Sequence, residues 1–129
     1  MLRALAHICF RVKDLDASID FYVNKLGLSH SFDFINDDGE RFGVYMHIGG
    51  RSFVELFKGD PEPTESWQHF CLEVDDVKTA CETFRGRGLE VTDPHFGEDG
   101  SWQCWVQDPD GNRIEFHSYT PESKQNVAL

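Results

Sequence analysis

Residues 7–15 read His-Ile-Cys-Phe-Arg-Val-Lys-Asp-Leu, and residues 69–77 read His-Phe-Cys-Leu-Glu-Val-Asp-Asp-Val. The two stretches align at a constant offset of 62 residues, and His, Cys, Val and Asp recur in register. Such self-similarity indicates that the chain contains two copies of one structural unit. In each copy, alternating apolar and polar residues lead into an aspartate, which predicts a strand followed by the start of a helix.

Each copy continues with a predicted helix. Asp14 and Asp76 are suited to cap the helix N-termini, because their carboxylates can accept hydrogen bonds from free backbone N–H groups. Apolar residues then recur at helical spacing, and a glycine follows that suits a left-handed helix end. The apolar positions are Leu15, Ile19, Tyr22 and Leu26 in the first copy and Val77, Ala80, Cys81 and Phe84 in the second; the glycines are Gly27, and Gly86 or Gly88.

Three further strands are predicted in each copy, separated by turn-forming sequences such as Asp108-Pro-Asp-Gly-Asn112. Their approximate ranges are 28–35, 42–48 and 52–57 in the first copy, and 89–92, 101–107 and 113–119 in the second. The sequence therefore predicts an α+β fold of two βαβββ modules, with eight strands and two main helices. Neither half can bury a sheet face alone, so we expect the halves to pair, within one chain or between two.

The predicted organisation is a single domain over residues 1–129. The first module covers about residues 4–59 and the second about residues 67–119. Residues 60–66 are polar and rich in proline, and they are predicted to link the modules. Residues 120–129 lack a clear period and are expected to form a loose tail.

Composition limits the classes of function. The net charge of −11 disfavours binding to nucleic acid or to an anionic membrane surface. No apolar run approaches the roughly 20 residues that span a bilayer, and the N-terminus does not resemble a signal peptide. The four cysteines form no Cys-x-x-Cys pair, which favours reduced, buried thiols and a cytoplasmic location.

Equivalent histidines and glutamates mark the two copies. Side chains alternate across a strand, so His7 and His69 lie on the polar faces of their strands. Glu55 and Glu115 occupy matching positions in the last strand of each copy. Each residue alone is more typical of a structural or surface role. Together they predict one divalent-metal site with two imidazole and two carboxylate ligands.

The chain resembles the vicinal oxygen chelate superfamily, which includes glyoxalase I, fosfomycin- and bleomycin-resistance proteins and extradiol dioxygenases. The resemblance covers about residues 4–119 and is carried by residues 7–22, by Leu26-Gly27-Leu28 and by Asp108-Pro-Asp-Gly-Asn-Arg-Ile-Glu115. The pattern is most similar to short bacterial glyoxalase I. That resemblance implies metal binding by His7, Glu55, His69 and Glu115, and contact of Arg11 with an anionic group of a small-molecule substrate.

The resemblance also implies a mechanism, in which two substrate oxygens chelate the metal and a carboxylate moves a proton. Glu115 is the first candidate for the base and Glu55 its partner. The metal could be Ni, Co, Zn, Mn or Fe. Glyoxalase I carries a Thr/Asn-Trp-Gly type segment that helps to hold glutathione, whereas residues 56–61 here read Leu-Phe-Lys-Gly-Asp-Pro. This difference favours a substrate other than the glutathione adduct.

Three functions stay open. The first is a metal-dependent lyase or isomerase of the glyoxalase type, with lactoylglutathione lyase as one candidate. The second is an Fe(II) extradiol-type dioxygenase, and the third is a metal-free small-molecule binding or resistance protein. Similar short members of the superfamily pair modules between chains, so we expect a homodimer whose metal site is shared between subunits. Aromatic residues could line the pocket, namely Tyr45, Phe53, Phe57, Phe96, Trp102 and Trp105, and residues 93–100 could form a loop that covers it.

Overall fold

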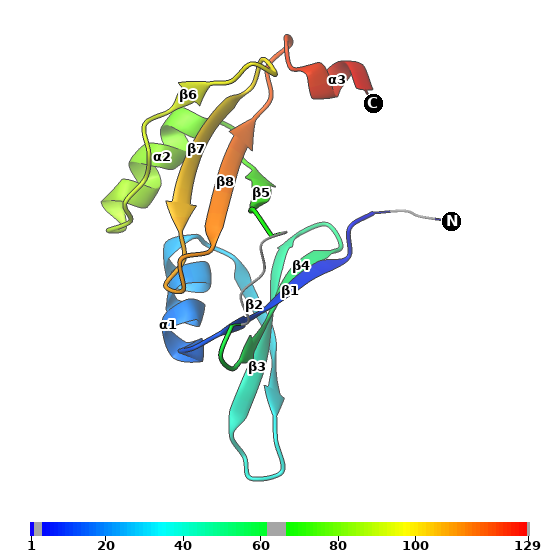
Figure 1. Cartoon of the computed structure of the whole chain (residues 1–129), viewed down its shortest axis with the longest axis vertical. Coiled ribbons are helices and arrows are strands. Elements are labelled where there is room, and N and C mark those ends of the chain that lie inside the picture. The colour runs from blue at the N-terminus through cyan, green and yellow to red at the C-terminus, as the bar shows by residue number, and fades with distance from the viewer. Residues whose placement is uncertain (2–3, 62–66, 129) are drawn as a thin grey trace. The chain divides into compact units, whose positions relative to one another are not determined.

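A computed structural model of the chain describes residue 1, residues 4–61 and residues 67–128. Most of the predicted linker, residues 62–66, lies outside the described residues. The chain divides into two compact units, residues 1–64 and 65–129. Each unit contains a four-stranded sheet and a main helix (Figure 1). No helix in the described part of the chain is long and apolar enough to cross a membrane.

The first unit follows the predicted βαβββ order. Its elements are β1 (His7–Val12), α1 (Leu15–Ile19), the π-helical turn η1 (Asp20–Lys25), β2 (Ser29–Ile35), β3 (Arg41–Gly49) and β4 (Ser52–Lys58). The strand order is β1-β4-β3-β2, with β1 parallel to β4 and the other pairs antiparallel. The first and last strands of the module are therefore neighbours.

The second unit repeats this topology. Its elements are β5 (Phe70–Glu73), α2 (Val77–Gly86), β6 (His95–Phe96), β7 (Trp102–Gln107), β8 (Arg113–Ser118) and α3 (Lys124–Ala128). The strand order is β5-β8-β7-β6, with β5 parallel to β8. The predicted α+β class with eight strands and two main helices is confirmed, and the structure adds the short helix α3.

The helix ends form as the sequence predicts. The carboxylate of Asp14 accepts a hydrogen bond of 3.0 Å from the backbone N–H of Ala17, and that of Asp76 accepts one of 2.8 Å from Thr79. Gly27 and Gly88 have φ of 93° and 87° and lie just beyond the helical segments. Positive φ is strained for residues with a side chain, so glycine suits both positions.

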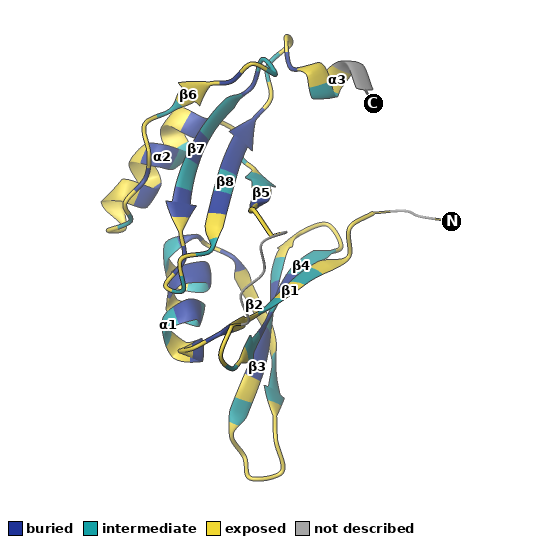
Figure 2. Ribbon diagram, in the orientation of Figure 1, coloured by how far each residue is buried: buried dark blue, intermediate teal, exposed yellow. Residues whose placement is uncertain are grey.

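Each sheet buries one face under its main helix. In the first unit α1 packs against β3 and β4, and in the second α2 packs against β7 and β8. Buried hydrophobic residues alternate along these strands, which Figure 2 colours by burial. They are Val44, Met46, Val54 and Leu56 in the first sheet and Cys104, Val106, Ile114 and Phe116 in the second. The side chains between them point to the opposite face, which is where the predicted site residues lie.

The predicted strand at residues 89–92 is wrong. The edge strand β6 instead spans only His95–Phe96, which pair with Gln103 and Trp102. Residues before it follow β7 irregularly: the backbone N–H of Thr92 donates to the Trp105 carbonyl at 3.1 Å. Pro94 has no N–H to donate, so a regular ladder cannot pass through it. The predicted cover loop, residues 93–100, therefore contains this short strand.

The expectation of a loose tail is also wrong for the described residues after Tyr119. Ser123 is fully buried, and its hydroxyl lies 2.7 Å from that of Ser101. The amide of Gln125 donates to Asp99 at 2.7 Å. These polar contacts hold the start of α3 against the turn before β7. They join residues more than 20 positions apart, so a search for hydrophobic periodicity does not detect them.

We expect Gly100→Ala to destabilise the protein more than Gly111→Ala. Both glycines have positive φ, 81° and 83°, so alanine should cost about 1 kcal/mol of backbone strain at either position. A Cβ at Gly100 would also lie 2.5 Å from the Glu122 carbonyl oxygen, whereas a Cβ at Gly111 meets nothing within 4 Å. Overpacking should add about 1–3 kcal/mol at Gly100 alone. Urea unfolding of both variants measures the difference, and equal losses would contradict the close approach of the tail.

Candidate metal centre

In the first unit, the parallel pairing of β1 with β4 brings a histidine to a glutamate. Phe53 is the register partner of His7, and Glu55 is the partner of Cys9. The His7 Nε2 and Glu55 Oε2 atoms are 3.9 Å apart. The His7 side chain is 43% exposed and that of Glu55 is 15% exposed. The structure therefore places both predicted ligands of this unit on the sheet face that α1 does not cover.

The second unit repeats the arrangement with β5 and β8. His69 lies directly before β5, and Glu115 in β8 is the register partner of Cys71. The His69 Nε2 and Glu115 Oε2 atoms are 3.1 Å apart, with side-chain exposures of 34% and 12%. Each unit thus presents an accessible imidazole nitrogen beside a largely covered carboxylate. Imidazole and carboxylate are common ligands of first-row divalent ions, so these pairs fit a metal.

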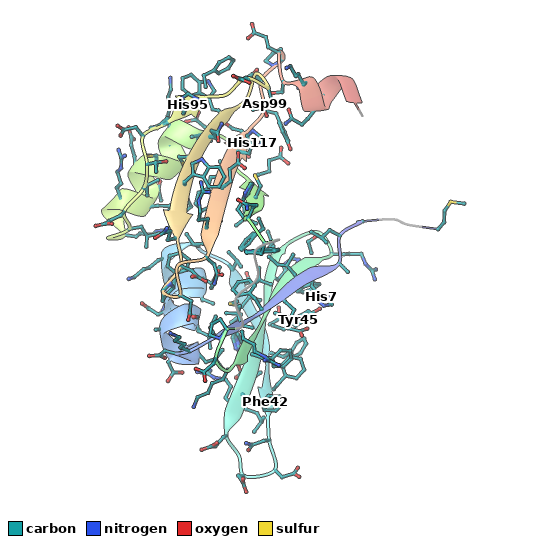
Figure 3. All side chains as sticks on the ribbon, in the orientation of Figure 1. His7, Phe42, Tyr45, His95, Asp99 and His117 are labelled. Atoms are coloured by element: carbon teal, nitrogen blue, oxygen red, sulfur yellow. The ribbon has the colours of Figure 1, made fainter. Side chains whose placement is uncertain are left out.

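An aromatic ring from the third strand of each unit contacts the histidine. Tyr45 in β3 lies opposite Glu55, with its ring centroid 5.6 Å from that of His7 (Figure 3). Trp105 in β7 lies opposite Glu115, and the centroids of its ring and of the His69 ring are 4.7 Å apart. These contacts restrict the orientation of the imidazoles. Both rings belong to the aromatic set that the sequence predicted beside the site.

Other predicted aromatic residues contact rings within their own unit. The ring centroids of Phe53 and Tyr45 are 5.0 Å apart, and those of Phe57 and Phe34 are 5.1 Å apart. In the second unit Phe96 and Trp102 are 5.4 Å apart. The first unit therefore carries a continuous aromatic surface beside His7.

The cysteines only partly match the expectation of buried thiols. All four are free, but only Cys81 and Cys104 are buried, whereas Cys9 and Cys71 are exposed. Although the residue as a whole is exposed, partial loss of water around the sulfur and a hydrogen bond to Glu55 raise the pKa of Cys9 to about 11. Burial and the charge of Glu115 raise the pKa of Cys71 to about 12. Each proposed metal carboxylate thus has a protonated thiol beside it on the neighbouring strand.

His117 was not among the residues predicted for the site. This residue follows Glu115 by two positions in β8, and the period of two in a strand places both on one sheet face. His117 Nδ1 lies 4.0 Å from Glu115 Oε1, and its Nε2 lies 3.2 Å from Asp99 Oδ2 (Figure 3). A hydrogen bond from Gln125 lowers the pKa of the Asp99 carboxyl. Strand alternation alone could have placed His117 on the same face as Glu115. Its contact with Asp99, however, depends on the fold of residues 97–101.

Arg11 shares the polar face of β1 with His7, and it is exposed. Its side chain lies against Gly59: a Cβ added to this glycine would be 3.3 Å from the Arg11 Cδ. The predicted contact of Arg11 with substrate stays a prediction. His95 is also exposed, in β6.

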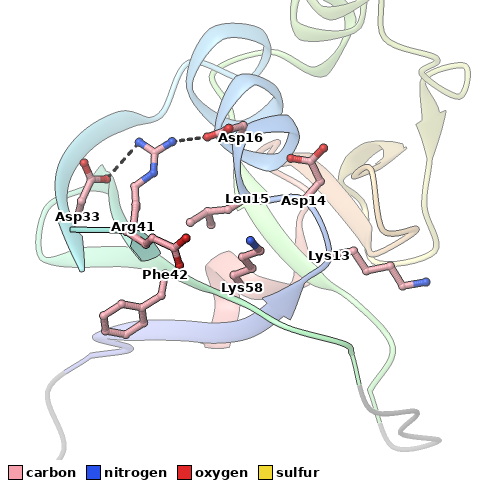
Figure 4. A pocket seen from close by; sticks show the side chains of 9 residues that line it. Lys13, Asp14, Leu15, Asp16, Asp33, Arg41, Phe42 and Lys58 are labelled. Carbon is pink, nitrogen blue, oxygen red and sulfur yellow. Dashed lines mark hydrogen bonds and ion pairs between the residues drawn. The ribbon is translucent and has the colours of Figure 1, made fainter. Parts of the chain in front are cut away.

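The first unit also has a charged hollow of about 620 Å³, which contains none of the predicted ligands (Figure 4). Arg41 forms ion pairs there with Asp16 and Asp33, and Leu15 and Phe42 supply apolar surface. The carboxylates of the hollow are thus partly neutralised within the unit. The candidate metal ligands are found on the open sheet face instead.

Comparison with known proteins identifies the family. Residues 4–116 match the model of the Glyoxalase/Bleomycin resistance protein/Dioxygenase superfamily. The chain belongs to this superfamily. It is 31% identical over 120 residues to a probable lactoylglutathione lyase of Vibrio cholerae serotype O1, and the match covers 86% of this chain and 87% of that protein.

Two solved structures share the fold of this chain. Lactoylglutathione lyase from Agrobacterium tumefaciens superposes with a TM-score of 0.70 at 25% identity, covering 89% of this chain and 92% of that one. TnmS3, an antibiotic binding protein from Streptomyces sp. CB03234, superposes with a TM-score of 0.77 at 26% identity, covering 92% and 98%. Solved proteins that resemble this chain in fold are therefore named both as an enzyme and as a binding protein.

Proposed function

We propose that this chain is a divalent-metal-dependent lyase or isomerase of the glyoxalase type. One observation carries the proposal: His7 with Glu55, and His69 with Glu115, are matching residues of the two repeats, and they form a histidine–glutamate pair in each unit. The lactoylglutathione lyase relatives support it. In this proposal the four side chains together hold one metal ion.

The bound ion would act as a Lewis acid that polarises neighbouring oxygens of the substrate. The chain's own residues then have distinct roles. Glu115 is the general base, because its carboxylate is largely shielded from water and lies beside an imidazole that would stay fixed. Glu55 is its partner carboxylate, and Arg11 orients an anionic group of the substrate. The rings of Tyr45 and Trp105 hold the two imidazoles in place.

Metal analysis and turnover test the proposal. We expect the purified protein to contain one divalent ion per chain, and metal-depleted protein to recover activity on reloading with Ni, Co, Zn or Mn. The first substrate to assay is the hemithioacetal of methylglyoxal and glutathione. Metal binding without turnover would support the metal centre but reject this substrate. That result would agree with the absence, after Glu55, of the segment that helps glyoxalase I to hold glutathione. Failure of His7→Ala and His69→Ala to lower metal content would reject the centre.

A second candidate is a metal-free protein that binds flat aromatic molecules. The aromatic surface of the first unit favours it: Phe32 is 48% exposed and stacks on Tyr45 at a centroid distance of 4.9 Å. The likeness to the antibiotic binding protein TnmS3 supports this candidate. Binding of an aromatic ligand that is unchanged by chelators and by His69→Ala would favour it over the enzyme.

An Fe(II) dioxygenase is a weaker alternative. Such sites use two histidines and one carboxylate and leave positions open for oxygen and substrate. A fourth protein ligand, Glu55, would occupy one of these positions. Oxygen consumption with a catechol by the iron-loaded protein would favour this alternative over the lyase.

A further inference from the structure

The ligand-bearing faces of the two units share a histidine, a cysteine and a glutamate, but they differ at the position two residues after the glutamate. Cys9 and Cys71, and Glu55 and Glu115, correspond in sequence and in strand register. His7 and His69 correspond in sequence. Two residues after each glutamate, however, the first unit has Phe57 and the second has His117. Phe57 is the register partner of Arg11, and His117 is that of Glu73, so the two positions are structurally equivalent. The second unit thus has one additional ligand beside its cysteine and glutamate.

These three residues of the second unit converge. A ligand atom from each of Cys71, Glu115 and His117 lies within 4.8 Å of the other two. Ligand atoms that share a zinc ion lie roughly 3–4 Å apart, because metal–ligand distances are about 2.0–2.3 Å. Small side-chain rotations would therefore bring all three to one ion. The thiol of Cys71 can leave its present contact at little cost, since it donates over a long 3.9 Å to the Leu72 carbonyl.

His117 supplies an independent indication of a missing ligand. The residue is 8% exposed, and Nε2 is buried without a hydrogen bond; the 3.2 Å approach to Asp99 lacks hydrogen-bond geometry. A buried polar nitrogen without a hydrogen bond destabilises the folded chain, because it has lost its contact with water and gained no partner. Nδ1 is the ring nitrogen that lies toward Glu115, so a cation held by Glu115 and Cys71 would bind Nδ1. The rotation of the ring that this requires would leave the unsatisfied Nε2 free to donate to Asp99. A metal-binding histidine commonly donates its second N–H to a carboxylate, which Asp99 can provide.

We propose that Cys71, Glu115 and His117 form a site for a thiophilic divalent cation within the second unit. The thiolate is the soft ligand that selects such ions over harder ones. Binding replaces the thiol proton, which passes to the buffer. The site takes nothing from His7 or Glu55, so it does not depend on the proposed function. An ion bound there would also engage Glu115 and so compete with its role beside His69.

Cadmium chloride is the probe, added to the metal-depleted full chain with a phosphine reductant. We expect one equivalent to produce ultraviolet absorption from thiolate-to-cadmium charge transfer. Cys71→Ser should abolish the absorption, and His117→Phe, which installs the residue of the first unit, should weaken binding by roughly 100-fold or more. Mutation of a residue that only hydrogen-bonds a metal ligand commonly lowers metal affinity by about 10–100-fold, so loss of a ligand itself should cost at least as much. Cys9→Ser is the matched control, because Cys9 has the same register to Glu55 but lacks the histidine, and it should keep the absorption.

His7→Ala separates this site from the four-ligand centre, since it should leave the cadmium signal unchanged. Loss of the signal in His7→Ala or Cys9→Ser, or its survival in Cys71→Ser, would overturn the proposal. Thiol alkylation of the unmutated chain guards against variants that fail to fold. Because Cys9 and Cys71 are both exposed, cadmium should protect Cys71 but not Cys9 from iodoacetamide, as peptide mass spectrometry can show. Equal protection or no protection of the two thiols would also overturn the proposal.

Discussion

Replacing Glu115 with Gln is expected to lower kcat/KM by roughly 10²–10⁴-fold, the usual contribution of a general base. The amide keeps the size of the carboxylate and one oxygen that can face a metal, but it is a far poorer base. Most of the bound metal should therefore remain. His69 provides the contrast: His69→Ala removes an imidazole nitrogen that lies 3.1 Å from Glu115, and it should lose the metal together with the activity.

Activity and metal content must be measured on the same preparations. Glu82→Gln is the matched control, because it makes the same chemical change on an exposed position of α2 in the same unit. It should stay within about twofold of the parent protein, as expected for a surface substitution outside the site. Near-normal turnover by the Glu115→Gln variant would remove Glu115 from the role of base. Loss of metal along with activity would instead assign Glu115 an essential ligand role and leave the base open.

The second large effect is the return of activity when two inactive variants are mixed. We propose a homodimer in which His7 and Glu55 of one subunit complete a site with His69 and Glu115 of the other. A two-fold axis then creates two equivalent sites. His7→Ala and His69→Ala should each be inactive alone. Their heterodimer would have one site without either histidine and one intact site.

Random mixing of equal amounts should restore about a quarter of the parent activity, since half of the dimers are heterodimers and half of their sites are intact. The variants should be mixed under conditions that exchange subunits, followed by size measurement and assay. Sites built within one chain would each lack a ligand, and the mixture would stay inactive. A monomeric mass with full metal content would exclude the shared site before any mixing.

The sequence was most informative where local pattern and internal repetition agree. The alternation around His7 and His69 predicted strands with one polar face, and β1 and β5 show it. Asp14 and Asp76 predicted the helix starts because capping depends on residues three positions away. Glu55 and Glu115 were grouped with the histidines because they occupy matching places in the repeat, and the structure adds that β1 with β4, and β5 with β8, are parallel neighbours.

The failed predictions have a common cause in contacts between distant residues. Residues 89–92 have the composition of a strand, but whether they pair depends on the path of β7 and on the missing N–H of Pro94. The tail after Tyr119 is polar, and it is ordered by hydrogen bonds to Asp99, Gly100 and Ser101 rather than by apolar burial.

The sequence by itself determined the two modules, the faces of their strands and a histidine and glutamate for each unit. Strand alternation, helix capping and turn chemistry are short-range, so one sequence carries enough information to predict them. Only the tertiary structure decided that His117 lies between Glu115 and Asp99, and that Gln125 holds Asp99 in place. Those contacts join residues up to 26 positions apart. Their formation depends on the positions of the turn before β7 and of the start of α3 in the folded chain, and no local sequence pattern specifies these positions.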